Sequence, residues 1–256
     1  MLLGVEQPKA TAAAFSPVVV TPTYNNARTV IDVLTRVRAT GLPLIVVNDG
    51  STDATAGLLA EFVRQNCRDV TVVTHERNRG KAAALKTGFA AAAKAGFTHA
   101  VTIDTDGQLD PEQIPELLAA ARDNPGALVV GCRDDGKADY PARSRLGRRI
   151  SNAAIRWESG VRIGDSQCGF RVYPVGFVRT TCCRAPYFAF EAEIITRAGW
   201  AGRPVVEVPV NCRYLPPGQR VSHFKPVKDT LRGIATHLRL LATAVLRIPP
   251  KWALRS

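Results

Sequence analysis

The sequence lacks several features that would place it quickly in a class. None of its 256 residues lies in an apolar run near the roughly 20 residues of a membrane-spanning helix. Its six cysteines form no paired Cys-x-x-Cys motifs, which argues against a zinc ribbon. No basic and then apolar segment at the N-terminus resembles a secretory signal. We therefore expect a reduced, cytoplasmic protein with mostly buried thiols.

Two nucleotide-binding signatures are also missing. The sequence contains neither GxxxxGK followed by Ser or Thr nor GxGxxG, so neither an ATPase phosphate loop nor a dinucleotide fingerprint is supported. Aromatic residues make up only 7% of the chain, and no basic recognition motif is interleaved with them. This composition argues against a nucleic-acid-binding protein, the class that a basic chain first suggests.

The charge is strongly positive and unevenly distributed. The net charge is +12, which is compatible with nucleic acid, an anionic membrane surface or phosphorylated ligands. Residues 1–130 hold 12 basic and 13 acidic residues, so their net charge is −1. Residues 131–256 hold 22 basic and 9 acidic residues, so their net charge is +13. The second half is therefore expected to face an anion.

Short apolar runs alternate with helical patterns in the first half of the chain. The predicted strands are 18–21, 44–47, 70–73, 100–103 and 128–130, and the predicted helices are 27–39, 54–65, 81–95 and one starting at Pro111. This alternation predicts an α/β fold with a mostly parallel sheet flanked by helices on both faces. Ligands of such sheets bind outside the carboxyl ends of the strands.

Polar residues follow the predicted strands. Asp104 and Asp106 come directly after one strand, where two carboxylates can hold a divalent cation, although Asp-x-Asp-Gly is also turn chemistry. Asp49 follows another strand and could bind a nucleoside or simply form a turn. Lys81 opens a helix, where it could meet an anion or remain solvated. One cleft lined by these residues would suit one polar ligand.

Four ordered motifs carry a resemblance to a known family. They are Pro22-Thr23-Tyr24-Asn25-Asn26, Val47-Asn48-Asp49-Gly50-Ser51-Thr52-Asp53, Asn78-Arg79-Gly80-Lys81 and Asp104-Thr105-Asp106-Gly107-Gln108. In order and spacing they resemble the family 2 glycosyltransferases, whose fold is the Rossmann-like GT-A fold. Residues 165–171 and 190–193 resemble the branch that transfers sugars to dolichyl and polyprenyl phosphates. The resemblance extends to about residue 232.

The resemblance implies a nucleotide-sugar site with a divalent metal. The donor would be a UDP- or GDP-hexose, and its binding residues would be Pro22, Thr23, Tyr24, Asn26, Asp49, Lys81, Asp104 and Asp106. Asp104 and Asp106 would hold Mg²⁺ or Mn²⁺ against the diphosphate, and family members invert the anomeric centre. Asn26 departs from the pattern, since many relatives have Glu there, and it leaves the nucleotide open between UDP and GDP.

The second half would supply the acceptor side. The candidate catalytic base is Glu191, followed by Glu193 and Asp165, unless the acidic residues merely begin a helix. The resemblance implies that four residues close over the diphosphate or acceptor: Arg171, Arg213, Ser222 and Lys225. The favoured acceptor is a polyprenyl phosphate. The alternative acceptor is a hydroxyl of a glycolipid or of an acyl or polyene lipid. An alternative to enzymatic activity is an inactive GT-A scaffold that serves as a partner module.

The C-terminal segment predicts a basic amphipathic helix. Its apolar residues step by three or four from Val227 to Ile248, with Lys and Arg off the stripe and Trp252 following. Such a helix suits the surface of an anionic bilayer, whereas the alternative is a helix packed on the domain. We thus expect a leader over 1–16, a glycosyltransferase domain over 17–225 (a donor half 17–132 and an acceptor half 133–225), and a basic segment over 226–256, peripheral on the inner membrane face.

Overall fold

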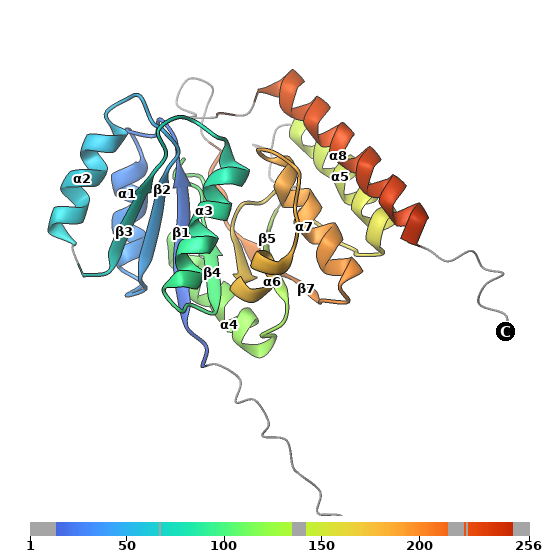
Figure 1. Cartoon of the computed structure of the whole chain (residues 1–256), viewed down its shortest axis with the longest axis horizontal. Helices are drawn as coiled ribbons and strands as arrows, with labels where there is room; N and C mark the ends of the chain where they lie inside the picture. The colour runs from blue at the N-terminus through green and yellow to red at the C-terminus, as the bar shows by residue number, and fades with distance from the viewer. Residues whose placement is uncertain (1–13, 67, 135–141, 215–222, 224, 248–256) are drawn as a thin grey trace, which may run out of the picture.

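The computed structural model describes residues 14–66, 68–134, 142–214, 223 and 225–247. One seven-stranded sheet forms its centre, in the order β3-β2-β1-β4-β6-β5-β7 (Figure 1). The strands are β1 (Pro17–Thr23), β2 (Leu44–Asn48), β3 (Val70–Thr74), β4 (His99–Thr102), β5 (Leu128–Arg133), β6 (Arg171–Pro174) and β7 (Val205–Val210). The predicted α/β fold with a mostly parallel sheet is confirmed, and the five predicted strands are β1 to β5.

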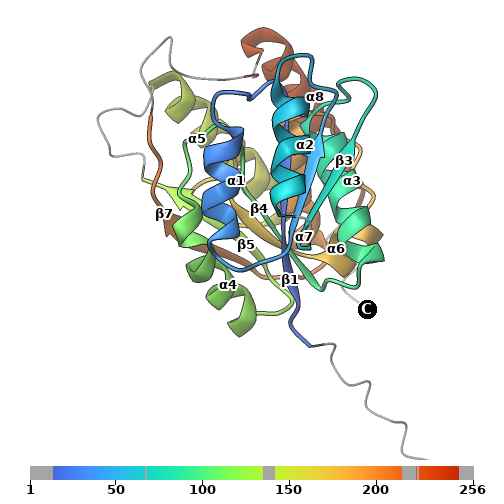
Figure 2. The same cartoon turned by 90° about the vertical axis from the view of Figure 1, so that its left-hand side faces the viewer.

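Helices cover both faces of this sheet. They are α1 (Val30–Arg38), α2 (Thr55–Gln65), α3 (Lys81–Lys94), the short 3-10 helix η1 (Pro111–Gln113), α4 (Ile114–Asp123), α5 (Ala142–Ser159), α6 (Val175–Thr180), α7 (Ala189–Trp200) and α8 (Pro226–Arg247). Seen from the β3 edge, α1 and α4 lie on one side of the sheet and α3 and α6 on the other (Figure 2). The helices predicted in the first half match α1 to α4, and Pro111 begins η1.

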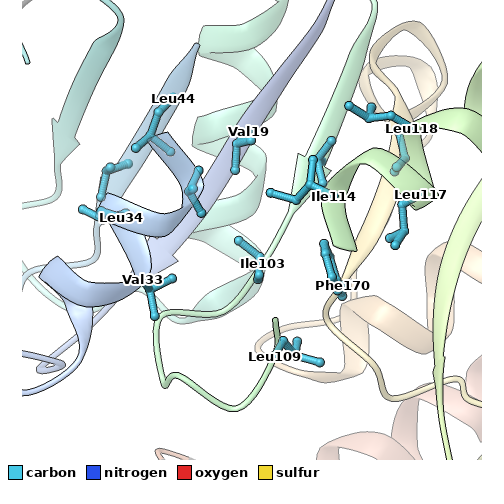
Figure 3. Close-up of a cluster of buried hydrophobic side chains, with 14 of the residues drawn as sticks. Val19, Val33, Leu34, Leu44, Ile103, Leu109, Ile114, Leu117, Leu118 and Phe170 are labelled. Atoms are coloured by element: carbon cyan, nitrogen blue, oxygen red, sulfur yellow. The ribbon is translucent and has the colours of Figure 1, made fainter. Parts of the chain in front are cut away.

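The two-residue period of the strands divides the core into two layers. Val19 points into the layer beneath α1 and α4, with Leu34 and Ile114 (Figure 3). Val18 and Val20 point to the opposite face, against Leu85 and its neighbours on α3. Because alternate side chains of a strand face opposite sides, a strand buried on both faces must be apolar at every position. This explains the uninterrupted valine run of β1.

The β6 strand breaks the parallel pattern. It lies between β4 and β5 and is antiparallel to both. Sequence periodicity did not predict β6, because it is only four residues long and begins with a buried arginine, Arg171. The helices α5, α7 and α8 pack against one another beside this half of the sheet. The proposed division of the chain at residues 132 and 225 stays a prediction.

The pairing of β1 with both β2 and β4 sets the place of the site. These pairs are parallel, with Thr23 opposite Asn48 and Val20 opposite Thr102. The carboxyl ends of all three strands therefore meet at one edge of the sheet. The polar segments that follow them in the sequence must leave the sheet side by side.

The close approach of α3 to the sheet gives the first prediction. A Cβ atom at Gly88 would lie 2.3 Å from Val20 Cγ1, in a fully packed layer. We expect Gly88→Ala to destabilise the protein by about 1–3 kcal/mol, as overpacking does. Gly57→Ala in α2 is the matched control, since nothing lies within 4 Å of its added methyl group. It should be neutral or stabilising by up to about 1 kcal/mol. Equal midpoints for the two variants in urea unfolding would contradict the packing described for α3.

Candidate active site

A pocket of about 700 Å³ opens at the carboxyl ends of β1, β2 and β4. One wall consists of the segments that follow these strands, and the opposite wall consists of the start of α8 and the residues before α7. The pocket is lined by Pro22, Thr23, Tyr24, Asn26, Asp49, Asn78, Gly80, Lys81, Ala84, Asp104, Thr105, Asp106, Tyr187, Phe188, His223, Lys225, Lys228, Asp229 and Arg232. All eight residues expected to bind the nucleotide sugar are in this lining, together with Lys225.

The acidic turn after β4 (residues 104–108) is anchored by hydrogen bonds of Thr105. This buried side chain accepts a hydrogen bond from Asn26 Nδ2 at 2.6 Å, and its hydroxyl lies 3.0 Å from Thr23 Oγ1. Asp106 accepts bonds from the backbone and side-chain nitrogens of Gln108, both at 3.0 Å. The segment is therefore a turn, as the local pattern allows, and the turn directs Asp104 and Asp106 to the pocket.

Lys81 forms a buried ion-pair cluster in the pocket wall. Its Nζ lies 2.7 Å from Asp104 Oδ1 and 2.8 Å from Glu191 Oε1, and so joins α3 to β4 and α7. Burial alone would lower the pKa of Lys81, but the charges of Asp104 and Glu191 outweigh burial and raise the pKa above its usual value. Lys81 is thus a permanent cation. A Cβ atom at Gly169 would lie 2.6 Å from Asp104 Oδ2, so only glycine fits beside this cluster.

Asp49 organises the start of α3. Its carboxylate accepts bonds from the backbone nitrogens of Arg79 and Gly80, at 2.9 and 2.7 Å, and lies 2.7 Å from His75 Nδ1. Gly80 has a φ of +89° and its Cα faces the ring of Tyr187, so a side chain there would be strained and would clash. Asp49 therefore fixes the backbone from which Lys81 extends.

Asn26 links the β1 segment to the opposite wall. Its Oδ1 lies 3.3 Å from Nε2 of His223, whose ring meets the Tyr24 ring edge-on at 5.2 Å. Partial desolvation lowers the pKa of His223 below its usual value, which favours the neutral ring. A neutral amide at position 26 can thus serve as donor to Thr105 and as acceptor from His223, which a carboxylate could not do.

Several pocket residues were not predicted. Tyr187 and Phe188 precede α7, and Lys228, Asp229 and Arg232 come from the first turns of α8. The guanidinium of Arg232 lies 3.8 Å from the centre of the Tyr187 ring and 2.7 Å from Asp229 Oδ1, so the wall is tied together. In the sequence, Lys228 and Arg232 are among the basic residues that lie off the apolar stripe of the predicted helix. That position was the only sequence signal that could have pointed to them as pocket residues.

The expected diphosphate role of Arg171 is not supported. Its side chain is fully buried, and its guanidinium donates to the backbone oxygens of Cys168, Ser166 and Glu191 at 2.7–2.8 Å. Arg171 therefore stabilises the segment before β6 and does not line the pocket. Of the remaining expected residues, Arg213 is exposed beside the acidic turn, where its backbone nitrogen donates to Gln108, and Ser222 lies outside the described residues.

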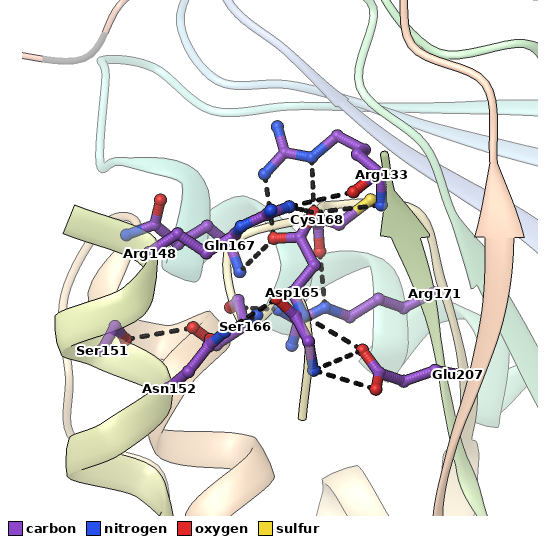
Figure 4. Close-up of polar contacts among 11 residues, drawn as sticks. Arg133, Arg148, Ser151, Asn152, Asp165, Ser166, Gln167, Cys168, Arg171 and Glu207 are labelled. Atoms are coloured by element: carbon purple, nitrogen blue, oxygen red, sulfur yellow. Dashed lines mark hydrogen bonds and ion pairs between the residues drawn. The ribbon is translucent and has the colours of Figure 1, made fainter. Parts of the chain in front are cut away.

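None of the three candidate bases is in the pocket lining, and two of them are enclosed by arginines. Asp165 is buried between Arg133, at 2.7 Å, and Arg148, at 3.2 Å (Figure 4). Burial raises its pKa, but the two arginines outweigh burial and the net pKa is below the usual value. Glu193 is likewise enclosed, by Arg197 and Arg239. Both carboxylates hold the fold together, so the catalytic roles expected for them are corrected to structural ones.

The described residues contain no group of three or more His, Cys, Asp or Glu that could hold a metal ion by itself. The pocket instead offers the two carboxylates of the acidic turn. Mg²⁺ typically binds one or two protein carboxylates and completes its shell with water and substrate phosphate oxygens. Asp104 and Asp106 fit that pattern. Asp104 also forms an ion pair with Lys81.

Comparison with solved structures defines the class of fold. A crystal structure described as a mycobacterial protein superposes with a TM-score of 0.62 at 20% identity, covering 93% of this chain and 77% of that one. S. aureus TarS 1–349 in complex with UDP superposes with a TM-score of 0.58 at 15% identity, covering 93% and 68%. The mostly parallel sheet flanked by helices is therefore a GT-A-like α/β fold.

The chain belongs to glycosyl transferase family 2, whose model matches residues 18–185. The polyprenol monophosphomannose synthase of Mycolicibacterium smegmatis is 28% identical over 213 residues, which are 80% of each chain. The undecaprenyl-phosphate 4-deoxy-4-formamido-L-arabinose transferase of Pseudomonas paraeruginosa is 34% identical over 162 residues. Those residues are 60% of this chain and 46% of that one, so this chain spans about half the length of that relative.

The buried ion-pair cluster gives the second prediction. Lys81→Met would leave the carboxylates of Asp104 and Glu191 facing each other without a counter-charge. Breaking a buried pair in this way costs roughly 3–5 kcal/mol. The double variant Lys81→Met/Glu191→Gln removes one of those charges and should recover part of the loss. The free energy of unfolding in urea measures both. A Lys81→Met variant as stable as the parent would contradict the cluster.

Proposed function

We propose that this protein is an inverting, metal-dependent hexosyltransferase acting on a polyprenyl phosphate. The donor would be a UDP- or GDP-hexose, and transfer would occur at the inner face of the membrane. One observation carries the proposal: a single pocket gathers the strand-end residues of the family motifs, with Asp104 and Asp106 facing Lys225, Lys228 and Arg232. The names of two relatives, each specifying a polyprenol or undecaprenyl-phosphate sugar transferase, support the choice of acceptor.

The two walls of the pocket divide the binding of the donor. The segment from Pro22 to Asn26 and the Asp49 turn would hold the nucleoside, since both lie at the β1 and β2 ends. The cations of α8 and Lys81 would face the diphosphate. The acidic turn would hold Mg²⁺ or Mn²⁺, which when bound neutralises negative charge on the departing nucleoside diphosphate.

Inversion requires attack on the anomeric carbon from the face opposite the leaving group. The acceptor oxygen forms the new bond to that carbon while the bond to the diphosphate oxygen breaks, and its electron pair leaves with the nucleoside diphosphate. A phosphate acceptor is already ionised at neutral pH and needs no strong base. This suits a site in which the first candidate base, Glu191, is 4% exposed, is already paired with Lys81 and does not line the pocket.

No helix in the described part of the chain is long and apolar enough to cross a bilayer. The proposed place of action, the inner membrane face, rests on the basic second half of the chain and on the lipid-linked acceptor.

The metal-binding turn gives the third prediction. A thermal-shift panel of UDP- and GDP-hexoses with Mn²⁺ should identify the donor by the largest rise in melting temperature. With that donor, Asp106→Asn should lower transfer at least about a hundredfold, because a metal's stabilisation of the leaving group is worth several kcal/mol. Asp32→Asn, an exposed aspartate of α1, is the control and should keep full activity. Undiminished transfer by Asp106→Asn would overturn metal-dependent catalysis at this turn.

The nature of the acceptor gives the fourth prediction. Glu191→Gln should lower transfer to polyprenyl phosphate less than about tenfold, since that nucleophile requires no general base. Transfer to a lipid hydroxyl would instead fall by roughly 10²–10⁴-fold, the contribution of a general base. Initial rates with both kinds of acceptor measure the difference. A large loss with polyprenyl phosphate would count against this acceptor class and favour the hydroxyl alternative.

A further inference from the structure

Large apolar side chains are exposed on two neighbouring helices. Every one that the described part of the chain leaves exposed lies on α5 or α8, which pack against each other at the outer edge of the molecule (Figure 1). On α5 they are Leu146, Ile150 and Trp157, and on α8 they are Val227, Leu231, Ile234, Leu238, Leu241, Val245 and Leu246. Apolar side chains concentrated in this way mark an interaction surface.

The inward face of α8 carries two buried apolar residues, Leu240 and Ala244, but is otherwise largely polar. Asp229 and Thr236 are buried, His237 Nδ1 lies 2.7 Å from the buried Glu158, and Arg239 lies 2.9 Å from Glu193. Leu231 and Leu238 of the predicted apolar stripe are 60% and 63% exposed. The alternative in which this stripe packs on the domain is therefore wrong for these residues. Polar contacts and the buried Leu240 and Ala244 attach the helix, and the apolar stripe of α8 stays uncovered.

On these two helices the acidic residues are buried, whereas several basic residues are exposed. Their acidic residues, Glu158 and Asp229, are both buried. Arg149 and Arg156 are exposed on α5, and Arg162 is exposed just after it. Trp157, 81% exposed, lines a groove of about 710 Å³ together with Arg156 and Arg162. The outward surface thus combines apolar side chains, arginines and a tryptophan without exposed acids among the described residues of α5 and α8.

We propose that α5 and α8 form a docking face for an anionic lipid bilayer. Such helices lie in the membrane interface with their apolar side buried, and basic residues add attraction to anionic headgroups. Tryptophan prefers the same depth, where its ring is apolar and its N–H meets water. A second copy of the chain is a poorer occupant, because a symmetric contact would bring the arginines of one face against those of the other.

Docking on this face would also bring the pocket close to the bilayer. Lys228, Asp229 and Arg232 in the first turns of α8 line the pocket, while Val227, Leu231 and Ile234 of the same turns face outward. A bilayer seated on α8 would then lie beside the pocket entrance. This inference deepens the proposed function by giving the lipid acceptor a route, but the binding of vesicles can be measured without donor, acceptor or turnover.

Flotation of the full chain with vesicles tests the docking face. The protein should bind vesicles of phosphatidylcholine mixed with phosphatidylglycerol and bind phosphatidylcholine alone more weakly, with a further loss at high salt. The triple variant Leu231→Ser/Ile234→Ser/Leu238→Ser should lower the partition coefficient at least about tenfold. Since all three side chains are more than half exposed, its melting temperature should stay near that of the parent.

Three further variants test the contribution of charge and the depth of insertion. Arg149→Ser/Arg156→Ser/Arg162→Ser should weaken binding, whereas Arg68→Ser/Lys94→Ser, exposed charges on other elements, should weaken it far less. The fluorescence of the parent should shift to the blue with anionic vesicles, and this shift should be smaller in Trp157→Phe.

Three results would overturn the proposal: no flotation of the parent, equal flotation of the triple apolar variant, or a stable dimer in light scattering that the triple variant dissolves. Thermal shifts with donor nucleotide should be unchanged in the triple variant. If the protein failed to bind nucleotide, this would count against the proposed function only. The flotation result would still test the docking face, because it needs no nucleotide.

Discussion

The buried ammonium of Lys81 between Asp104 and Glu191 is the contact on which the site depends. It is 2.7–2.8 Å from both carboxylates and joins the start of α3, the end of β4 and the first turn of α7. Without it, these two carboxylates would have no counter-charge between them. Gly169, whose lack of a side chain makes room for the cluster, and Asp49, which fixes the backbone at Gly80, both serve this arrangement.

The helix α8 connects the pocket with the outer surface. Its inward polar contacts with Glu158 and Glu193 hold it on α5 and α7, and its first turns supply a cationic wall opposite the acidic turn. The two halves of the chain, which differ in net charge, thus supply opposite walls of the pocket. Carboxylates from the neutral half and cations from the basic half face each other across one pocket, and an anionic diphosphate with a divalent cation suits the gap between them.

Local sequence patterns predicted the donor side well and the acceptor side poorly. The strands β1 to β4 each contain a short run of apolar or β-branched residues, so the polar residues at their ends, such as Asp49 and Asp104, could be placed at one edge. Arg171, Asp165 and Glu193 were misplaced because a charged residue in a sequence does not show that its partners are arginines or backbone carbonyls from distant segments. Tyr187 and Arg232 reach the pocket through tertiary packing that periodicity does not encode.

Hydrogen exchange with and without the donor nucleotide tests the central claim most directly. If the pocket binds the nucleotide sugar, a saturating nucleoside diphosphate with Mn²⁺ should slow amide exchange in the segments 23–26, 48–51, 78–81 and 104–108 together, since all four border the pocket. The loops at the opposite edge of the sheet should exchange unchanged. Saturable binding that protects other segments and leaves these four unaffected would contradict the account.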